Sequence, residues 1–241
     1  MNVEHDMGEV RVRPWQESSL RFRWSRAGLA FLPSWYVVPD DVAPHFVVDD
    51  VLIEKTRQLC PGGGVPAGLF AESARGRFPG VSLAHDLLCE GAHLEVRVSN
   101  VTGVERCFRC GVVGRIVEHG QSRARGSHMV VGLETRATPT RECHEVVMGE
   151  RVRLSMTPTY LYVPDGVLDD FMVDELFVLS GGIYSRVPRE MLSHKSLRKH
   201  AEITLIPDRI VLAGSLLKLL ARPVIPSYFR GAVLGAIGEV A

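Results

Sequence analysis

The chain has 241 residues, long enough for one large domain or for two of ordinary size, each with a substantial core. Lys plus Arg and Asp plus Glu both number 28, so the formal net charge is zero, and bulk charge gives no reason to expect nucleic acid or an anionic membrane as a partner. Hydrophobic residues make up 46% and charged residues 23% of the chain, which excludes disorder as its general state.

The N-terminal stretch MNVEHDMGEV is acidic where a Sec-type signal peptide is basic and then apolar. No later stretch approaches the roughly 18 uncharged residues of a membrane span. The five cysteines are too sparse and odd in number for a disulfide framework. We therefore expect a soluble protein without a Sec-type signal, either cytoplasmic or incorporated in a particle.

The first predicted elements are strands. The segment GEVRVRPW, residues 8–15, is a strand-rich arm suited to adding to a neighbour's sheet. In LRFRW (residues 20–24) and LEVRVS (residues 94–99), apolar and polar residues alternate with the period of a half-buried strand. The runs FVVDDVLI and GVVGRIV are short, rich in β-branched residues and bounded by turn formers, which is typical of more fully buried strands.

An internal repeat organises the chain. Residues 33–51, PSWYVVPDDVAPHFVVDDV, align without gaps on residues 158–176, PTYLYVPDGVLDDFMVDEL, with 8 identities in 19. Chance would give about one identity at average residue usage. A second block, CFRCGVVGRIVE at residues 107–118, aligns on YFRGAVLGAIGE at residues 228–239 with 6 identities in 12. Two blocks in the same order and at nearly the same separation predict two copies of one unit.

These boundaries predict a first domain at residues 1–118, a polar, glycine-containing linker at 119–128 and a second domain at 129–241. Turn signals recur about every eight to twelve residues, as expected for antiparallel sheets. The predicted fold is all-β, with two tandem, internally repeated antiparallel β-sandwich or barrel-like domains. At most one or two short helices are expected: one at residues 188–200 and a shorter turn at residues 66–78.

The sequence contains no complete cofactor, metal or catalytic motif. The CFRC spacing at Cys107 and Cys110 falls in a predicted strand, where residues three apart point to opposite faces and cannot ligate one metal. The glycine-rich PGGGVPAG lacks the Lys-Ser/Thr ending of a phosphate loop and is interpreted as a tolerant loop between strands. HEVVM carries Met148 where a zinc signature needs its second histidine. We therefore predict no cofactor and no metal, and an enzyme is the less favoured possibility.

Acidic residues recur in both copies and suggest structural ion pairs. The copies share an Arg within a Phe-Arg dipeptide, and we predict that Arg109 pairs with Asp49 or Asp50. In the second copy, Arg230 is expected to pair with Asp174 or Glu175. Oxygen ligands grouped near strand ends would also suit calcium, but ion pairs are the preferred interpretation.

Three functional classes remain open. The first is a non-catalytic structural or assembly protein, such as a subunit of a virion or shell, for which self-association or other subunits are the expected partners. The second is a glycan-binding module, in which exposed aromatic rings would stack on sugars. The third is an enzyme with a site between the domains. The aromatic candidates for stacking on a ligand are Trp15, Trp24, Trp35 and Tyr160.

Overall fold

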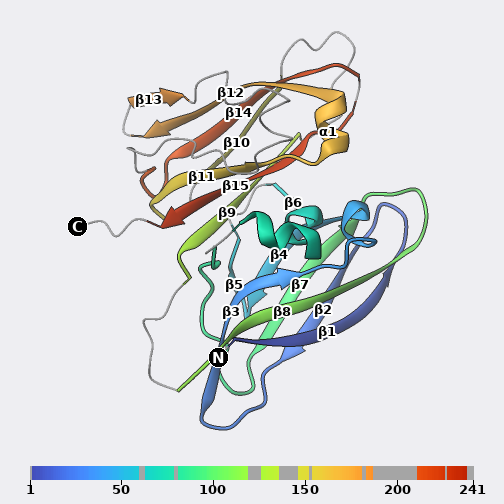
Figure 1. Ribbon diagram of the computed structural model, residues 1–241, viewed down its shortest axis with the longest axis vertical. Coiled ribbons are helices and arrows are strands. Elements are labelled where there is room, and N and C mark those ends of the chain that lie inside the picture. Colours follow the sequence, from blue (N-terminus) through green and yellow to red (C-terminus); the bar gives the residue numbers. More distant parts are fainter. Residues whose placement is uncertain are drawn as a thin grey trace. The chain divides into compact units, whose positions relative to one another are not determined.

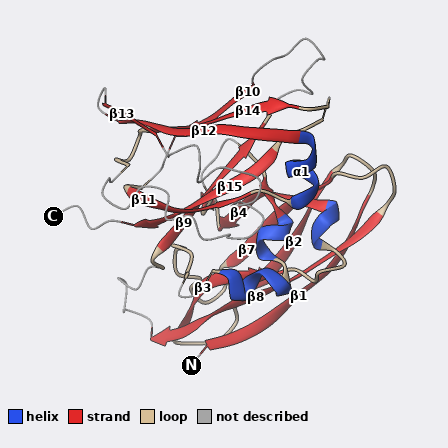
Figure 2. Cartoon of the chain, turned by 45° about the horizontal axis from the view of Figure 1, so that its top comes forward, coloured by secondary structure: helices blue, strands red, loops and turns tan. Residues whose placement is uncertain are grey.

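The computed structural model describes residues 2–59, 63–78, 81–118, 126–135, 146–151, 154–180, 183–186, 211–225 and 227–237. Its regular structure is almost entirely strand (Figure 2), which confirms the prediction of an all-β chain. The helical elements of this part are one six-residue α-helix and three short 3-10 turns. None of the described helices is long and apolar enough to cross a membrane. The helix predicted at residues 188–200 lies outside the described residues.

The chain divides into two compact units. Unit 1 consists of Met1–Leu59 and Pro66–Ser127, and unit 2 consists of His128–Ala241 together with Cys60–Val65. The elements of unit 1 are β1 (Asn2–Val12), β2 (Glu17–Arg23), β3 (Leu29–Val37), η1 (Ala43–His45), β4 (Phe46–Ile53), β5 (Thr56–Arg57), η2 (Ala67–Phe70), η3 (Glu72–Arg77), β7 (His93–Asn100) and β8 (Arg106–Glu118), and the short β6 (Val65–Pro66) stands at the boundary. Those of unit 2 are β9 (His128–Glu134), β10 (Val146–Arg151), β11 (Met156–Tyr162), α1 (Asp165–Asp170), β12 (Phe171–Ser180), β13 (Ile183–Arg186), β14 (Leu216–Pro223) and β15 (Arg230–Ile237).

Unit 1 is built from two antiparallel sheets, with strand orders β1-β8-β3 and β2-β7-β4-β5 (Figure 1). An additional segment lies along the free edge of β3, where Leu83 N donates to Ser34 O at 2.7 Å and Leu88 and Phe31 exchange backbone hydrogen bonds of 2.8 and 2.9 Å. From β1 to β4 consecutive strands alternate between the two sheets, and strands distant in the sequence, such as β1 and β8 or β2 and β7, pair within each one. This is the strand order of a jelly roll.

Unit 2 repeats this topology strand for strand. Its sheets have the orders β9-β15-β11 and β10-β14-β12-β13 (Figure 1). Val211 and Met156 exchange backbone hydrogen bonds of 2.9 and 2.7 Å at the edge of β11, as Leu88 and Phe31 do at the edge of β3. The fold prediction of two tandem, internally repeated antiparallel β-sandwiches is therefore confirmed, and each sandwich is a jelly roll.

The repeat extends to irregularities within the strands. The register shifts between Pro33 and Trp35 in β3, and between Pro158 and Tyr160 in β11. A second shift falls between Val48 and Asp50 in β4, with its counterpart between Val173 and Glu175 in β12. Bulges of this kind re-aim side chains and are properties of a fold rather than defects. The aligned sequence blocks thus correspond residue for residue in three dimensions.

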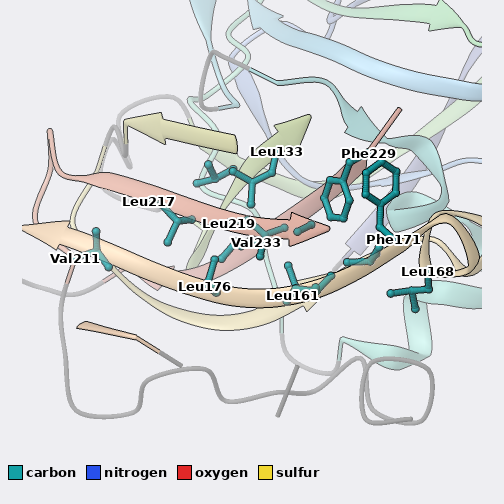
Figure 3. Close-up of a cluster of buried hydrophobic side chains, with 14 of the residues drawn as sticks. Leu133, Leu161, Leu168, Phe171, Leu176, Val211, Leu217, Leu219, Phe229 and Val233 are labelled. Carbon is teal, nitrogen blue, oxygen red and sulfur yellow. The ribbon is translucent and has the colours of Figure 1, made fainter. Parts of the chain in front are cut away.

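Alternating burial in the strands produces each core. Leu94, Val96 and Val98 of β7 are buried, while the residues between them are partly or fully exposed, as the sequence period predicted. In unit 2 the buried cluster draws side chains from both sheets, including Leu161 and Val233 of one and Leu176, Leu217 and Leu219 of the other (Figure 3). Both units place one aromatic pair between their sheets: the rings of Phe46 and Phe108 lie 5.0 Å apart, and those of Phe171 and Phe229 lie 5.3 Å apart.

The segment Cys60–Val65 lies within the first copy of the sequence but belongs to unit 2 in the structure. The sequence repeat did not predict this assignment. A Cβ on Gly63 would lie 2.9 Å from the carbonyl oxygen of Gly132, so the two backbones approach closely because neither residue has a side chain. Gly63 therefore has a packing role, which corrects the interpretation of the PGGGVPAG glycines as features of a tolerant loop.

Candidate functional site

Exposed apolar side chains gather at one end of each unit. Among the described residues, seven large hydrophobic side chains are exposed: Trp15, Val104, Met172, Leu212, Val224, Ile225 and Tyr228. All except Leu212 lie in or beside the β1–β2 and β7–β8 connections of unit 1 or the β14–β15 connection of unit 2. We call this end the loop end of each unit. Apolar groups gathered on a surface mark interaction sites more often than scattered ones do.

Trp15 occupies a backbone conformation that is unfavourable for its residue type. Gln16 N donates to Arg13 O at 3.2 Å, which closes a tight turn with Pro14 in its second position and Trp15 in its third. Trp15 has φ = 57°, in the left-handed region where such turns usually carry glycine. A side chain there costs about 1–2 kcal/mol. The ring is nevertheless 67% exposed, so packing within the unit does little to offset this cost.

A buried asparagine holds the Trp15 turn against the β7–β8 connection. Asn100 is 1% exposed, and its Nδ2 donates to Val12 O at 2.9 Å and to Val104 O at 2.8 Å. Its Oδ1 accepts from the backbone N and the hydroxyl of Thr102, at 2.9 and 2.8 Å. Its own backbone N donates to Gln16 O at 3.0 Å. One side chain thus fixes both loops, which places Trp15 and Val104 on adjoining segments.

We expect Asn100→Ala to destabilise the protein by about 2 kcal/mol or more, because it leaves two carbonyl oxygens and one N–H of a buried network without their partner. Urea unfolding followed by tryptophan fluorescence measures this effect. Thr102→Val is the matched control, since it removes only a hydroxyl at the edge of the network and should cost less than about 1 kcal/mol. Equal losses for the two variants would show that Asn100 is not the central residue.

The loop end of unit 2 presents an exposed apolar patch, which we define as Met172, Val224 and Ile225. The backbone N of Val224 donates to Asp170 O at 2.7 Å, and that of Ile225 reaches the same oxygen at 3.5 Å. Met172 lies opposite Arg222 in the β12–β14 ladder, so Met172 and Val224 are diagonal neighbours on one face, a spacing within reach of long side chains. The three side chains are 45%, 59% and 51% exposed.

Charge differs between the two loop ends. Arg13, next to Trp15, forms no ion pair with a described residue. In unit 2, α1 carries the acidic residues Asp165, Asp169 and Asp170, and Asp170 lies beside the patch, because its backbone oxygen accepts from Val224 N. The arginines at this end, Arg222 and Arg230, lie against Asp174 and Glu134.

The predicted ion pairs are not the ones that form. Arg109 Nη2 donates to both carboxylate oxygens of Asp41, at 2.9 and 3.1 Å, instead of pairing with Asp49 or Asp50. Arg230 lies 3.8 Å from Glu134 on the neighbouring strand β9. The physical reason is the face of its strand on which each arginine lies. Phe108 and Phe229 face the core, so the arginine that follows each points away from the opposite sheet that carries the predicted acids.

The acidic residues that were predicted to pair with Arg109 and Arg230 lie on β4 and β12, where Asp49, Asp50 and Asp174 have other partners. Ser99 Oγ donates to Asp49 at 2.7 Å, and Arg222 Nη2 donates to Asp174 at 2.7 Å, from equivalent places on β7 and β14. Asp50 lies 3.1 Å from Arg57. Burial raises the pKa of the Asp50 carboxyl above its usual value, and the charge of Arg57 opposes that shift.

Glu175 stands at the β12 bulge, opposite Leu220 and at the place that Asp50 has in unit 1. Groups of three or more metal-binding side chains are absent from the part of the chain that the structure describes.

The aromatic candidates for ligand stacking divide into two classes. Trp24 and Trp35 are buried, at 2% and 6% exposure, so their rings belong to the core of unit 1. The stacking hypothesis is corrected for these two residues, whose apolar faces are covered by Phe31 and Phe70. Tyr160 is partly buried in β11, and only Trp15 presents most of its ring to solvent.

The CFRC cysteines lie on opposite faces of β8, as the period of a strand requires. Cys107 is exposed and Cys110 is buried, and neither forms a disulfide. Burial raises the pKa of the Cys110 thiol to about 12. A thiol in that state is a poor nucleophile and a poor metal ligand.

The arm of residues 8–15 pairs within its own unit. β1 forms the outer strand of its sheet and pairs with β8 from Asn2 opposite Arg115 to Val12 opposite Arg106. A register shift between Asp6 and Glu9 interrupts this edge, and Gly8 has φ = 85° there. Bulges and charges on an edge strand discourage pairing with other chains. The structure therefore favours the loop end over the β1 edge as an interaction surface.

These features define a tandem jelly-roll protein whose exposed apolar side chains gather at the loop ends. No protein-family model and no curated protein matches the sequence. Among solved structures, the chain is similar to the major capsid protein P2 from bacteriophage PM2, with 9% identity and a TM-score of 0.45 over 100% of this chain and 99% of that chain.

Two further structures show lower similarity. A salicylate 1,2-dioxygenase from Pseudaminobacter salicylatoxidans has 8% identity and a TM-score of 0.17, over 95% of this chain and 70% of that chain. A vicilin from Solanum melongena has 10% identity and a TM-score of 0.15, over 93% of this chain and 75% of that chain.

Sequence reasoning missed the patch of unit 2 and placed Trp15 only among general stacking candidates. A signal for the Trp15 turn was present, because proline in RPWQ favours the second position of a tight turn and so puts tryptophan third. The apolar pair in PVIP, Val224 and Ile225, gave no such signal, since exposure depends on the surrounding fold.

Proposed function

We propose that the chain is a non-catalytic structural subunit that assembles with further copies, or with other subunits, into a multi-subunit particle such as a virion or shell. The observation that carries this proposal is the gathering of exposed apolar side chains at the loop ends of both units. Such surfaces become stable when another protein covers them.

The duplication supports the same function. Each unit presents the same arrangement of strands and loops, so one chain offers two related but different surfaces to its neighbours. Assemblies are built from repeated contacts between such surfaces. The edge strand β1 is interrupted by a bulge, which favours the loops over this edge for specific association.

Light scattering tests the proposal. Over about a hundredfold range of protein concentration, we expect the weight-average mass to rise well above the 26.6 kDa of one chain, by mass action. Apolar contacts should persist at high salt, where surface ion pairs weaken. A constant mass of one chain under all these conditions would contradict assembly from this chain alone.

A glycan-binding module is the second candidate, and the exposed ring of Trp15 is the observation that favours it. Jelly rolls include lectin domains, and an aromatic face on a loop can cover an apolar sugar face. This function predicts a monomer whose tryptophan fluorescence changes when a glycan binds. Loss of that change in Trp15→Gly would support it.

A further inference from the structure

We infer that the Trp15 turn of one copy docks on the apolar patch of unit 2, Met172, Val224 and Ile225, of a second copy. This inference rests on the proposed assembly function and names the contact that would produce it. The contact joins two unlike surfaces, the turn of one copy and the patch of the other, and we call it head-to-tail in this sense.

The Trp15 turn has the properties of an anchor. Its ring is 67% exposed, and Val104 on the adjoining loop is 53% exposed. The side-chain and backbone hydrogen bonds of Asn100 hold both loops in place before any partner arrives, so little conformational freedom remains to be lost on binding. Tryptophan is among the residues that most often dominate the energy of an interface.

The patch of unit 2 fits this anchor in chemistry and in charge. It is apolar and exposed, and Asp170, the last residue of α1, adjoins it through the hydrogen bond from Val224 N to its backbone oxygen. Arg13, beside Trp15, has no ion-pair partner among the described residues. A tryptophan with a basic neighbour is complementary to an apolar patch with an acidic neighbour.

A contact between two identical Trp15 turns fits less well. It would bring the Arg13 side chains of both copies to one interface, and like charges oppose each other there. A head-to-tail contact avoids this, because each copy contributes one basic anchor and one acidic patch. Each chain carries one anchor and one patch, so contacts of this kind either pair two copies reciprocally or continue through further copies.

The decisive experiment uses two variants of the full chain and their mixture. Trp15→Gly removes the anchor and relieves the left-handed backbone, so we expect a melting temperature not lower than that of the unaltered protein. The double variant Val224→Ser with Ile225→Ser removes most of the patch. Each change should weaken self-association about 30-fold or more, measured by sedimentation velocity. Leu212→Ser is the matched control, because Leu212 is 49% exposed at the opposite end of unit 2 and should change nothing.

The mixture separates a head-to-tail contact from the alternatives. The Trp15→Gly chain keeps its patch and the double variant keeps its Trp15, so the two together should form a dimer that neither forms alone and that does not grow. Absence of this mixed dimer, when the unaltered protein does associate, would overturn the inference and leave the proposed function standing. If the unaltered protein stays monomeric at all concentrations, the inferred contact and assembly from this chain alone both fail, and of the proposed function only assembly with other subunits is left.

A charge exchange provides an independent readout. Arg13→Glu should weaken association, and adding Asp170→Lys to the partner chain should restore part of it. Association is restored only if residues 13 and 170 face each other across the contact. A substitution that merely destabilises the fold would not be rescued in this way. A loss in Arg13→Glu that no charge reversal on α1 restores would contradict the predicted orientation.

Discussion

Phe108→Ala is expected to lower the free energy of unfolding of unit 1 by about 3–5 kcal/mol. Phe108 is fully buried, and its ring lies 5.0 Å from that of Phe46, so one contact joins the two sheets of the jelly roll. Removing the ring forfeits its transfer free energy and leaves a cavity between sheets that cannot close without moving strands. A double-mutant cycle with Phe46→Ala should show about 0.5–1.5 kcal/mol of coupling between the rings.

The duplicated pair supplies the control for this experiment. All three tryptophans of the chain, at positions 15, 24 and 35, lie in unit 1, so tryptophan fluorescence reports on that unit. Phe229→Ala removes the equivalent ring of unit 2, which packs against Phe171 (Figure 3). We expect Phe229→Ala to lower the free energy of unfolding measured by circular dichroism by a similar amount. The change in the transition measured by tryptophan fluorescence should be smaller. A loss below about 1 kcal/mol for Phe108→Ala would contradict the role of the aromatic pair.

Gly114→Ala is expected to destabilise unit 1 by about 3 kcal/mol or more, whereas the equivalent Gly235→Ala should cost about 1 kcal/mol in unit 2. A Cβ at Gly114 would meet the carbonyl oxygen of Leu32 and lie 2.6 Å from Cζ of Phe31. Both are rigid, because one is backbone and the other is a buried ring. The three atoms nearest to a Cβ at Gly235 all belong to the side chain of Met156, with Cγ at 2.8 Å and Cβ at 3.0 Å, and an unbranched side chain adapts more readily than a backbone carbonyl.

Chemical denaturation of the two glycine variants, followed by fluorescence for unit 1 and by circular dichroism for both units, measures this difference. The comparison is matched, because Gly114 and Gly235 occupy the same place opposite Pro33 and Pro158 beside the same bulge. Equal losses in the two variants would show that the glycines are required for backbone conformation rather than for space.

Several features followed from local patterns alone. The repeat was visible because both copies keep the residues that their shared backbone geometry requires. Examples are the proline and the aromatic residue of the β3 and β11 bulges, and the glycine opposite each proline. Alternation of apolar and polar residues placed Leu94, Val96 and Val98 in the core. The same period put Cys107 and Cys110 on opposite faces of β8.

Other features could not be predicted from those patterns. The sequence suggested that Arg109 and Arg230 would pair with acids on β4 and β12, but a partner across a sandwich depends on which side of the strand faces the other sheet. Trp24 was as much a candidate for binding as Trp15, whereas the alignment of Trp35 with Tyr160 inside a strand block already suggested a core position for Trp35. The burial of Trp24 and Trp35 depends on strands from both sheets closing over them.

The sequence by itself determined the all-β class, the duplication and the alternating burial of strands such as β7, because these depend on residue periodicity and on self-similarity, which are local properties. Only the tertiary structure decided the jelly-roll strand order, the membership of Cys60–Val65 in unit 2 and the gathering of Trp15, Val104, Val224 and Ile225 at the loop ends. These features arise from contacts between segments far apart in the chain. Such contacts are set by which faces the packed sheets cover and which they leave open to solvent.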